Sequence, residues 1–240
     1  MRALEDHLRR QVDRSHGFFW HRLRWRAVSQ FLPRDRAFTL VDIGAGAGMV
    51  GRYLRDEFPA GAYHFVEPIR SLEDLLVERH GADSNARNRT SYTGVDVVTL
   101  LDVLEHQEDD RSFAEQLIAK TVPGTTIVVT VPALQPLWST WDAALGHFRR
   151  YNKRTLAQVW MGHPVRVVEL SYLFPEMLPA AVLRKLRQPD AGKIEGGESA
   201  EFPDLPRVLD RALYGLGTVS LGLRRLAPLG TSLLLAMERW

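Results

Sequence analysis

The sequence contains no cysteine among its 240 residues. Disulfides, thiolate nucleophiles and cysteine-ligated metals are therefore excluded, so any metal must be held by histidine, aspartate or glutamate. The N-terminus also lacks the apolar stretch of a secretory signal, because residues 1–10 include five charged side chains. Both absences lead us to expect a cytoplasmic protein.

Long apolar runs and net charge are scarce as well. The longest uncharged run, residues 121–141, contains three prolines and many threonines, and the uncharged runs 212–223 and 226–237 are twelve residues long. A helix needs about 20 predominantly apolar residues to span a bilayer. The 31 basic and 29 acidic residues give a formal charge of +2, which is too small to favour a nucleic-acid partner. A composition of 45% apolar and 25% charged residues predicts a folded globular protein without a membrane span.

The middle of the chain has an α/β pattern. Between residues 38 and 132, short β-rich runs alternate with helical runs, which predicts parallel strands joined by helical crossovers. Two further strands are expected at residues 165–172 and 230–237. The 57 residues between these two strands contain two helical stretches and a polar segment rich in glycine and glutamate.

These patterns predict a core with two additions. Residues 1–36 form an N-terminal helical lid or flank, in which the helical pattern ends at Leu32 and Pro33. The core comprises residues 37–171 and 229–240, and a helical cap, residues 172–228, is inserted before the last strand. Apolar positions on the second cap helix could serve the core, an acyl-chain pocket or a homodimer, and periodicity does not separate these three uses.

A glycine-rich turn follows the first predicted strand. In LVDIGAGAG, residues 40–48, glycines 44, 46 and 48 permit a sharp turn and a close approach of backbone amides to a ligand at a helix start. Met49 stands where a dinucleotide fingerprint would place a third spaced glycine. Glu67 ends the next strand nineteen residues after Gly48, where a carboxylate can accept hydrogen bonds from both hydroxyls of a ribose. Together these features favour a nucleoside ligand that carries an amino acid.

The loop, the acid and their strand context resemble the class I, Rossmann-like methyltransferases that use S-adenosylmethionine. The resemblance implies a seven-stranded, mostly parallel sheet flanked by helices. It places Asp42 near the methionine amino group, the loop amides along the cofactor and Glu67 at the ribose. The segment 82–92, ADSNARNRTSY, lacks the family's acidic adenine motif. The cofactor-binding residues predicted in this way are Asp42, Gly44, Ala45, Gly46, Gly48, Glu67, Leu101 and Asp102.

A second motif, DVLEH at residues 102–106, follows the strand expected at residues 95–101. Reaction groups collect at the carboxyl ends of parallel strands. If the chain turns helical there, positions 102, 105 and 106 share one face. The spacing is similar to the ExxEH sequence that holds a divalent cation in small-RNA 2′-O-methyltransferases and ubiquinone-pathway O-methyltransferases, with Asp102 in place of a longer glutamate.

The resemblance extends to a metal site, to which a later histidine contributes in the RNA enzymes. It implies the ligands Asp102, Glu105, His106 and His147, and oxygen and nitrogen ligands without sulfur suit Mg²⁺ or Mn²⁺. The alternative is that DVLEH is a cofactor-side segment without metal, in which Glu105 caps or pairs and His106 contacts the substrate. His147 is then the general base, unless it merely bonds the backbone of its own loop.

The loop that follows the next strand, ending in GHFRRY at residues 146–151, is rich in aromatic and charged residues. Such a loop is expected to border the crevice and bind the acceptor. The predicted acceptor-binding residues are Trp138, Asp142, Arg149, Arg150 and Tyr151. For the arginines the alternative is a solvated basic face, and the tryptophans 138 and 141 either stack on a sugar or close the core.

These features lead us to expect an O-methyltransferase. An alcohol does not ionise at neutral pH, so a base or a metal near the acceptor favours oxygen as the nucleophile. The motifs look like a bacterial group found near glycan and natural-product pathways, and the acceptor expected first is a hydroxyl of a sugar or glycoside. The alternatives are a phenol or amine acceptor, a cofactor-binding regulatory module without catalysis, and an RNA 2′-O-methyltransferase, which the small net charge disfavours.

Overall fold

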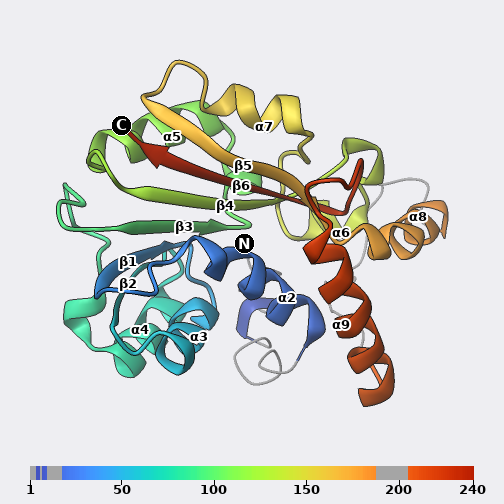
Figure 1. Cartoon of the computed structure of the whole chain (residues 1–240), viewed down its shortest axis with the longest axis horizontal. Helices are drawn as coiled ribbons and strands as arrows, with labels where there is room; N and C mark the ends of the chain where they lie inside the picture. The colour runs from blue at the N-terminus through green and yellow to red at the C-terminus, as the bar shows by residue number, and fades with distance from the viewer. Residues whose placement is uncertain (1–3, 6, 10–17, 188–204) are drawn as a thin grey trace.

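The computed structural model describes residues 4, 5, 7–9, 18–187 and 205–240. Its centre is a six-stranded sheet with the order β2-β1-β3-β4-β6-β5 (Figure 1). The first four strands run parallel, and β6 is antiparallel to both of its neighbours. The strands are β1 (Phe38–Ile43), β2 (Gly61–Val66), β3 (Val97–Leu101), β4 (Thr126–Pro132), β5 (Val165–Leu173) and β6 (Ser232–Arg239).

Helices connect the parallel strands, as the alternating pattern predicts. The α-helices are α2 (Phe19–Val28), α3 (Met49–Glu57), α4 (Arg70–His80), α5 (Asp110–Lys120), α6 (Thr140–Ala144), α7 (Lys153–Val159), α8 (Leu178–Arg187) and α9 (Arg207–Gly222). The short 3-10 helices are η2 (Ser29–Phe31), η3 (Ala82–Ser84), η4 (Leu104–His106), η5 (Gln135–Leu137) and η6 (Pro175–Met177).

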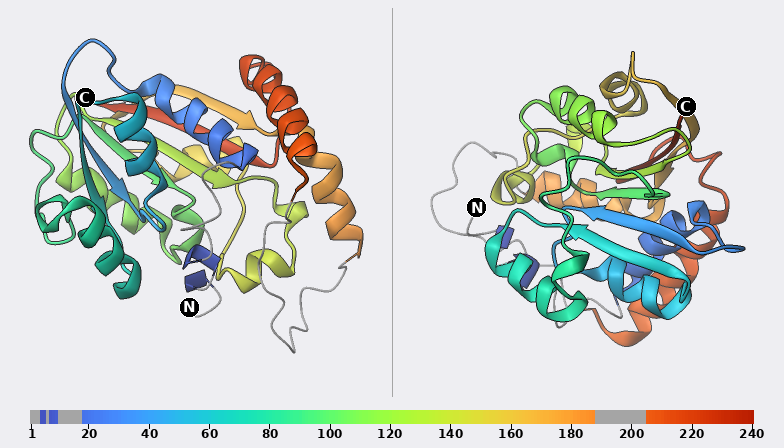
Figure 2. Two further views of the ribbon diagram at one scale, coloured as in Figure 1. Left: turned by 90° about the horizontal axis from the view of Figure 1, so that it is seen from below. Right: turned by 90° about the vertical axis from the view of Figure 1, so that its left-hand side faces the viewer.

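The strands bury both faces of the sheet because their side chains alternate in direction. In β1, Val41 and Ile43 join the cluster under α5 and α7, whereas Phe38 and Leu40 pack with α3. On the face that α3 covers, the half of the sheet formed by β4 and β6 is covered by α2 and α9, which lie side by side (Figure 2). Asp42 has the same parity as Leu40, so its carboxylate points to the α3 side.

The expectation of seven strands is wrong for the described residues, which form six. The missing strand would pair with the outer edge of β2. At that position the chain makes a single parallel bridge between Phe65 and Asn85. Two features of this segment prevent a longer strand. Asn85 and Arg87 use their polar groups on Glu73, and the backbone turns again as Arg89 N–H bonds Ala86. The polar segment 82–92 therefore supplies one bridge instead of a ladder.

The chain between β5 and β6 carries α8 and α9, where the cap is expected. The polar loop anticipated at residues 188–200 lies outside the described residues, as does most of residues 1–17. Helix α9 packs against α2 through Leu221, Leu23 and Phe19, and Asp210 accepts hydrogen bonds from Phe19 N and Arg22. Within the described ranges, no helix is long and apolar enough to cross a membrane.

Candidate active site

The glycine-rich turn has the backbone that its sequence predicts. Gly44, Gly46 and Gly48 all have positive φ angles, of 70°, 53° and 73°, in the left-handed region that side chains disfavour. A Cβ atom on Gly44 would lie 2.6 Å from Val103, and one on Gly48 would lie 2.5 Å from Leu76. Glycine is required here by conformation and by space, and the contact with Val103 brings the turn against the DVLEH segment.

Glu67 is held against the glycine-rich turn by two backbone amides. Its side chain is buried, and its two carboxylate oxygens accept hydrogen bonds from Gly46 N at 2.7 Å and Ile69 N at 2.8 Å. Burial raises the pKa of Glu67 even though both backbone donors oppose the shift. A carboxylate oxygen can accept more than one hydrogen bond, so each retains capacity for a hydroxyl.

Asp42 is fully enclosed beside the turn. It accepts hydrogen bonds from Thr99 Oγ1 at 2.7 Å and from Tyr63 OH at 3.2 Å. Burial raises the pKa of Asp42 to about 7, against the opposing effect of these two hydrogen bonds and of Arg24. A cationic amino group nearby would favour the ionised form, which is the role that the family resemblance implies for this acid.

Leu8 lies against the same glycine-rich turn. A Cβ atom on Gly46 would come within 3.2 Å of the Leu8 side chain. Ser71, at the start of α4, donates to Glu5 and accepts from Arg9 Nε at 3.3 Å. Glu5, Leu8 and Arg9 therefore border the glycine-rich turn and the start of α4.

Asp102 occupies a strained position immediately after β3. Its φ of +59° is unusual for a residue with a side chain, and its N–H bonds Thr130 O at 2.9 Å. The carboxylate forms an ion pair with Arg24 of α2 and accepts from Thr130 Oγ1 at 3.3 Å. The expected helical face shared by positions 102, 105 and 106 does not form, because the chain reverses at Asp102 before η4 begins.

Glu105, His106 and His147 form a compact cluster. One donor atom of each lies within 4.8 Å of the others, and the two imidazole rings meet edge to face with centroids 4.7 Å apart. Phe148 N–H donates to Glu105 O at 2.7 Å, which ties the later loop to DVLEH. Asp102 is not a member of this cluster, so three of the four predicted ligands come together.

Glu105 is the most unusual side chain in the cluster. It is fully buried, and neither carboxylate oxygen has a hydrogen-bond partner among the residues that the structure describes. Burial, followed by the nearby charge of Asp102, raises the pKa of Glu105 well above its usual range. Burial and His147 lower the pKa of His106 to about 4, so His106 is neutral at pH 7. A buried carboxyl without a partner is costly unless a proton, a cation or a ligand satisfies it.

His147 is held by Asp142. Its Nδ1 lies 3.0 Å from Asp142 Oδ1, and Arg150 Nε donates to the same oxygen at 2.8 Å. Burial opposes ionisation of Asp142, but the hydrogen bonds and charges of His147 and Arg150 outweigh it and lower its pKa. An ionised Asp142 makes Nδ1 the protonated nitrogen, so Nε2 keeps its lone pair.

The loop that follows β4, residues 133–151, owes its shape to the same acid. Asp142 has no exposed surface and also accepts from Ser139 N at 2.9 Å, completing a capping box at the start of α6. The predicted contact between Asp142 and an acceptor is therefore blocked by protein donors. Asp142 positions His147 and the loop instead.

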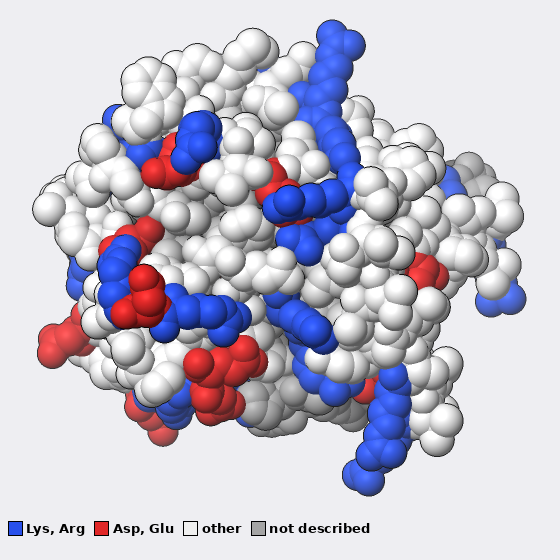
Figure 3. Space-filling view, in the orientation of Figure 1, with Lys and Arg blue, Asp and Glu red and all other residues white. Residues whose placement is uncertain are grey.

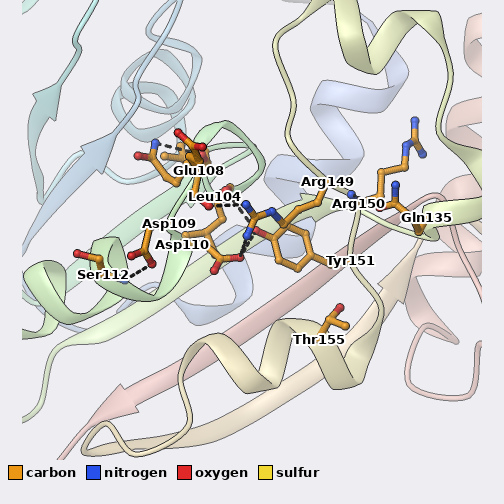
Figure 4. Close-up of polar contacts among 12 residues, drawn as sticks. Leu104, Glu108, Asp109, Asp110, Ser112, Gln135, Arg149, Arg150, Tyr151 and Thr155 are labelled. Carbon is orange, nitrogen blue, oxygen red and sulfur yellow. Dashed lines mark hydrogen bonds and ion pairs between the residues drawn. The ribbon is translucent and has the colours of Figure 1, made fainter. Parts of the chain in front are cut away.

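The GHFRRY residues anchor the loop to the core (Figure 4). Arg149 bonds Glu108 O and pairs with Asp110 at 3.0 Å, while Arg150 NH1 donates to Ala133 O at 3.2 Å. Tyr151 is buried, and its hydroxyl donates to Asp110 at 2.8 Å. These contacts use the polar groups that were predicted to bind the acceptor. Trp138 and Trp141 remain partly exposed.

A family model described as a methyltransferase domain matches residues 10–170. The chain belongs to this methyltransferase family. It is an S-adenosylmethionine-dependent methyltransferase, and solved structures with this fold contain S-adenosylmethionine or S-adenosylhomocysteine. A search of curated protein sequences finds no match.

Three solved structures illustrate the likeness. A putative methyltransferase of Haloferax volcanii, in complex with the Trm112 activator, is 17% identical with a TM-score of 0.60 over 98% of this chain and 96% of that one. Haemonchus contortus phosphoethanolamine N-methyltransferase 2 is 14% identical, with a TM-score of 0.57 over 92% of this chain, which spans about half (52%) of that chain's length. Geranyl diphosphate C-methyltransferase of Streptomyces coelicolor A3(2), solved with Mg²⁺, is 16% identical, with a TM-score of 0.56 over 92% and 80%. At these identities the likeness establishes the fold, and the two acceptors that are named, phosphoethanolamine and geranyl diphosphate, differ.

The methyltransferase site also contains residues that sequence reasoning missed. Arg24 reaches Asp102 from α2, and Tyr63 and Thr99 hold Asp42 from the two neighbouring strands. The strand residues could have been found, because Thr99 is the register partner of Asp42 and a polar residue in a β-rich run. Arg24 gave no such signal among the many arginines of the first 36 residues.

Proposed function

We propose that this methyltransferase transfers the methyl group to a hydroxyl of a small polar acceptor in the cytoplasm, with a sugar or glycoside as the acceptor to test first. The observation that carries the proposal is the Asp142–His147 pair, joined at 3.0 Å, beside the buried Glu105, whose carboxylate has no hydrogen-bond partner among the described residues. Such a group of titratable side chains next to the cofactor turn is suited to removing a proton.

Cofactor binding falls to residues around the glycine turn. Glu67 would accept the ribose hydroxyls, Asp42 would face the amino group, and the open backbone of glycines 44, 46 and 48 would lie along the ligand. When bound, S-adenosylmethionine supplies an activated methyl group. Holding the acceptor in line with that group is worth about 7 to 11 kcal/mol of the barrier.

His147 is the residue best placed to take the acceptor proton. With Nδ1 held by Asp142, its Nε2 is the basic nitrogen, and a positioned base contributes roughly 10² to 10⁴ in rate. The buried pair orients the ring, in the way that a carboxylate fixes the tautomer of a catalytic histidine. His106, neutral and in edge contact with His147, then borders the acceptor.

The cluster also fits a divalent cation. The supporting observation is that the Glu105 carboxylate oxygens lack a hydrogen-bond partner in the part of the chain that the structure describes. The donors would be Glu105, His106 and His147, without Asp102, whose carboxylate is paired with Arg24. Because Asp142 holds Nδ1, a cation would occupy Nε2 of His147, so the metal is an alternative to His147 as the free base. Two imidazoles and one carboxylate suit Mn²⁺, Fe²⁺ or Zn²⁺ better than Mg²⁺, which prefers oxygen ligands. A bound cation would lower the pKa of an acceptor hydroxyl.

Fewer residues are free to bind the acceptor than the sequence predicts. Arg149, Arg150 and Tyr151 hold the loop, so the partly exposed Trp138 is the predicted residue with an apolar surface to offer a sugar ring. An aromatic face stacks equally well on a phenol. The test must therefore include phenols and amines beside sugars.

The experiment is a methyl-transfer assay with labelled S-adenosylmethionine and a panel of sugars, glycosides, phenols and amines. Each reaction is run after chelation and again with Mn²⁺, Zn²⁺ or Mg²⁺. Transfer to a sugar hydroxyl supports the proposal, and transfer confined to amines overturns it. Loss of activity on chelation with recovery in Mn²⁺ supports the metal, whereas activity unchanged by chelation leaves His147 as the base. Cofactor binding without transfer to any acceptor would favour a regulatory module.

A further inference from the structure

Helices α8 and α9 carry an unusual amount of exposed apolar surface. Among the described residues, fifteen large hydrophobic side chains are exposed, and ten of them lie between residues 182 and 229. We call these ten side chains the cap face: Val182, Leu183, Leu186, Val208, Leu209, Leu216, Val219, Leu223, Leu226 and Leu229. A contiguous exposed apolar patch in a folded protein marks an interaction surface.

The exposed side of α9 is a continuous stripe. Val208, Ala212, Leu216, Val219 and Leu223 follow one another at intervals of three or four residues and so share one side of the helix. Val208 is 79% exposed and Val219 is 62% exposed. The helix packs on α2 through its other side, where Gly217 and Leu221 are buried. The protein core therefore does not account for the stripe.

Helix α8 continues the cap face toward the active site. Leu186 is 72% exposed, and the guanidinium of Arg184 lies 4.8 Å from the centre of the Trp141 ring. Trp141 belongs to α6, the helix that carries Asp142. The cap face thus borders the loop that positions His147.

The exposed charged side chains of α8 and α9 are basic. Helix α8 contributes Arg184, Lys185 and Arg187 and no acid. In α9, Arg207 and Arg211 are exposed, whereas its acid, Asp210, is paired with Arg22 at 2.7 Å. Figure 3 shows the side of α8 and α9 as largely uncharged surface, with basic side chains projecting at its margin and small acidic areas between them. Apolar residues flanked by arginine and lysine are typical of helices that lie in a lipid interface.

We propose that the cap face binds the surface of an anionic lipid bilayer. A symmetric dimer through this face would oppose basic residues to basic residues, because a two-fold interface meets its own copy. An anionic bilayer complements both features at once, taking up the leucines and valines and neutralising the arginines. The proposal goes beyond the proposed acceptor chemistry and does not depend on it.

The segment that joins the two helices, residues 188–204, lies outside the described residues and carries five acids and one lysine. These charges act against an anionic surface, so the test must assign binding to the helices themselves. Substitutions on the described helices, made in the full chain, do this because they leave the connecting segment unchanged.

The experiment is co-sedimentation of the full chain with vesicles of phosphatidylcholine alone or mixed with phosphatidylglycerol. We expect binding to the mixed vesicles, weakened by salt because the attraction is screened. Leu216→Glu combined with Val219→Glu should lower the partition at least tenfold. Arg207→Glu combined with Arg211→Glu should lower it by roughly fivefold or more per residue. Met161→Glu is the matched control, because Met161 is 68% exposed but lies outside the cap face, and it should bind as the wild type does.

Three outcomes overturn the proposal. The first is no binding to either vesicle, and the second is equal binding to both. The third is a dimer, seen by light scattering without lipid, that Leu216→Glu with Val219→Glu dissociates while vesicle binding is unaffected. Circular dichroism and cofactor binding of each variant verify that the fold is retained, so a loss of partition reports on the surface alone.

Discussion

Two buried aspartates in this protein have opposite protonation behaviour, and their neighbours explain why. Asp42 receives hydrogen bonds from two hydroxyl groups, which do not offset the cost of burying its charge. Asp142 receives them from an arginine and a histidine, and these cationic or polar partners hold the ionised form. Hydroxyl donors thus leave Asp42 able to respond to a ligand, whereas Asp142 is a fixed anion.

The raised pKa of Asp42 predicts a pH dependence of stability. The folded protein holds a proton on Asp42 up to about pH 7, whereas the unfolded chain loses it near pH 3.8. The folded state therefore binds more protons between these values, and the unfolding free energy must fall as pH rises through this window. Relative to Asp42→Asn, which does not titrate, the wild type should lose a few kcal/mol, since one pKa unit is about 1.36 kcal/mol. Urea unfolding of both proteins from pH 4 to 8 measures this, and parallel curves would refute it.

The fixed anion at Asp142 predicts a kinetic effect. Asp142→Asn keeps the volume of the side chain but no longer holds the proton on Nδ1 of His147. We expect kcat to fall about 10- to 100-fold, with the acceptor KM and the cofactor Kd little changed. Glu108→Gln, an exposed substitution nearby, is the control and should leave kcat unchanged. A rise in KM with kcat intact would assign Asp142 to loop structure alone.

At the scale of elements, local patterns were good predictors and long-range contacts were not. The alternation of β-rich and helical runs predicted six strands near their observed bounds, because the signals of a buried strand and of a glycine turn depend only on residues that are close in sequence. The glycine turn, Glu67 and the cluster of Glu105, His106 and His147 could be anticipated because carboxyl ends of parallel strands meet at one edge. The prediction of a seventh strand was wrong, because the polar segment at residues 82–92 contains no β-rich run.

The roles of Asp102 and Asp142 could not be predicted, because their partners are remote or compete with the acceptor. Arg24 lies 78 residues before Asp102, and no spacing rule connects them. Asp142, Arg149 and Arg150 have the residue types of a sugar site, but the fold uses their polar groups to hold the loop. Residue type alone does not distinguish a ligand contact from an anchor.

Two glycines of α9 give a matched test of how this helix packs. A Cβ atom on Gly217 would lie 2.1 Å from Leu23 of α2, whereas one on Gly215 would meet nothing within 4 Å. Gly217→Ala should therefore destabilise the protein by about 1 to 3 kcal/mol through overpacking. Gly215→Ala should stabilise it by up to about 1 kcal/mol, because alanine favours a helix more than glycine does. Thermal unfolding of both variants checks this, and equal effects would mean that α9 does not pack on α2 as described.

At the scale of the molecule, the parallel and antiparallel halves of the sheet carry different parts of the structure. The parallel half, β2-β1-β3-β4, ends in the glycine turn, Glu67 and the DVLEH segment. The antiparallel half, β6 and β5, carries α8 and α9. The loop of residues 133–151 follows β4, at the boundary between these halves, and Ala133 in it forms a β-bridge to Tyr151. The proposed base, His147, therefore lies on the loop between the half that carries the glycine turn and the half that carries α8 and α9.

The most direct test of this account is the methyl-transfer rate of His147→Ala on whichever acceptor the wild type uses. If His147 removes the acceptor proton, kcat should fall by roughly 10² to 10⁴. The Kd for S-adenosylmethionine should stay at the wild-type value, because we propose that Glu67 and the glycine turn bind the cofactor. A variant that keeps the wild-type kcat would contradict the proposed base and leave the cluster of Glu105, His106 and His147 without a role in the reaction.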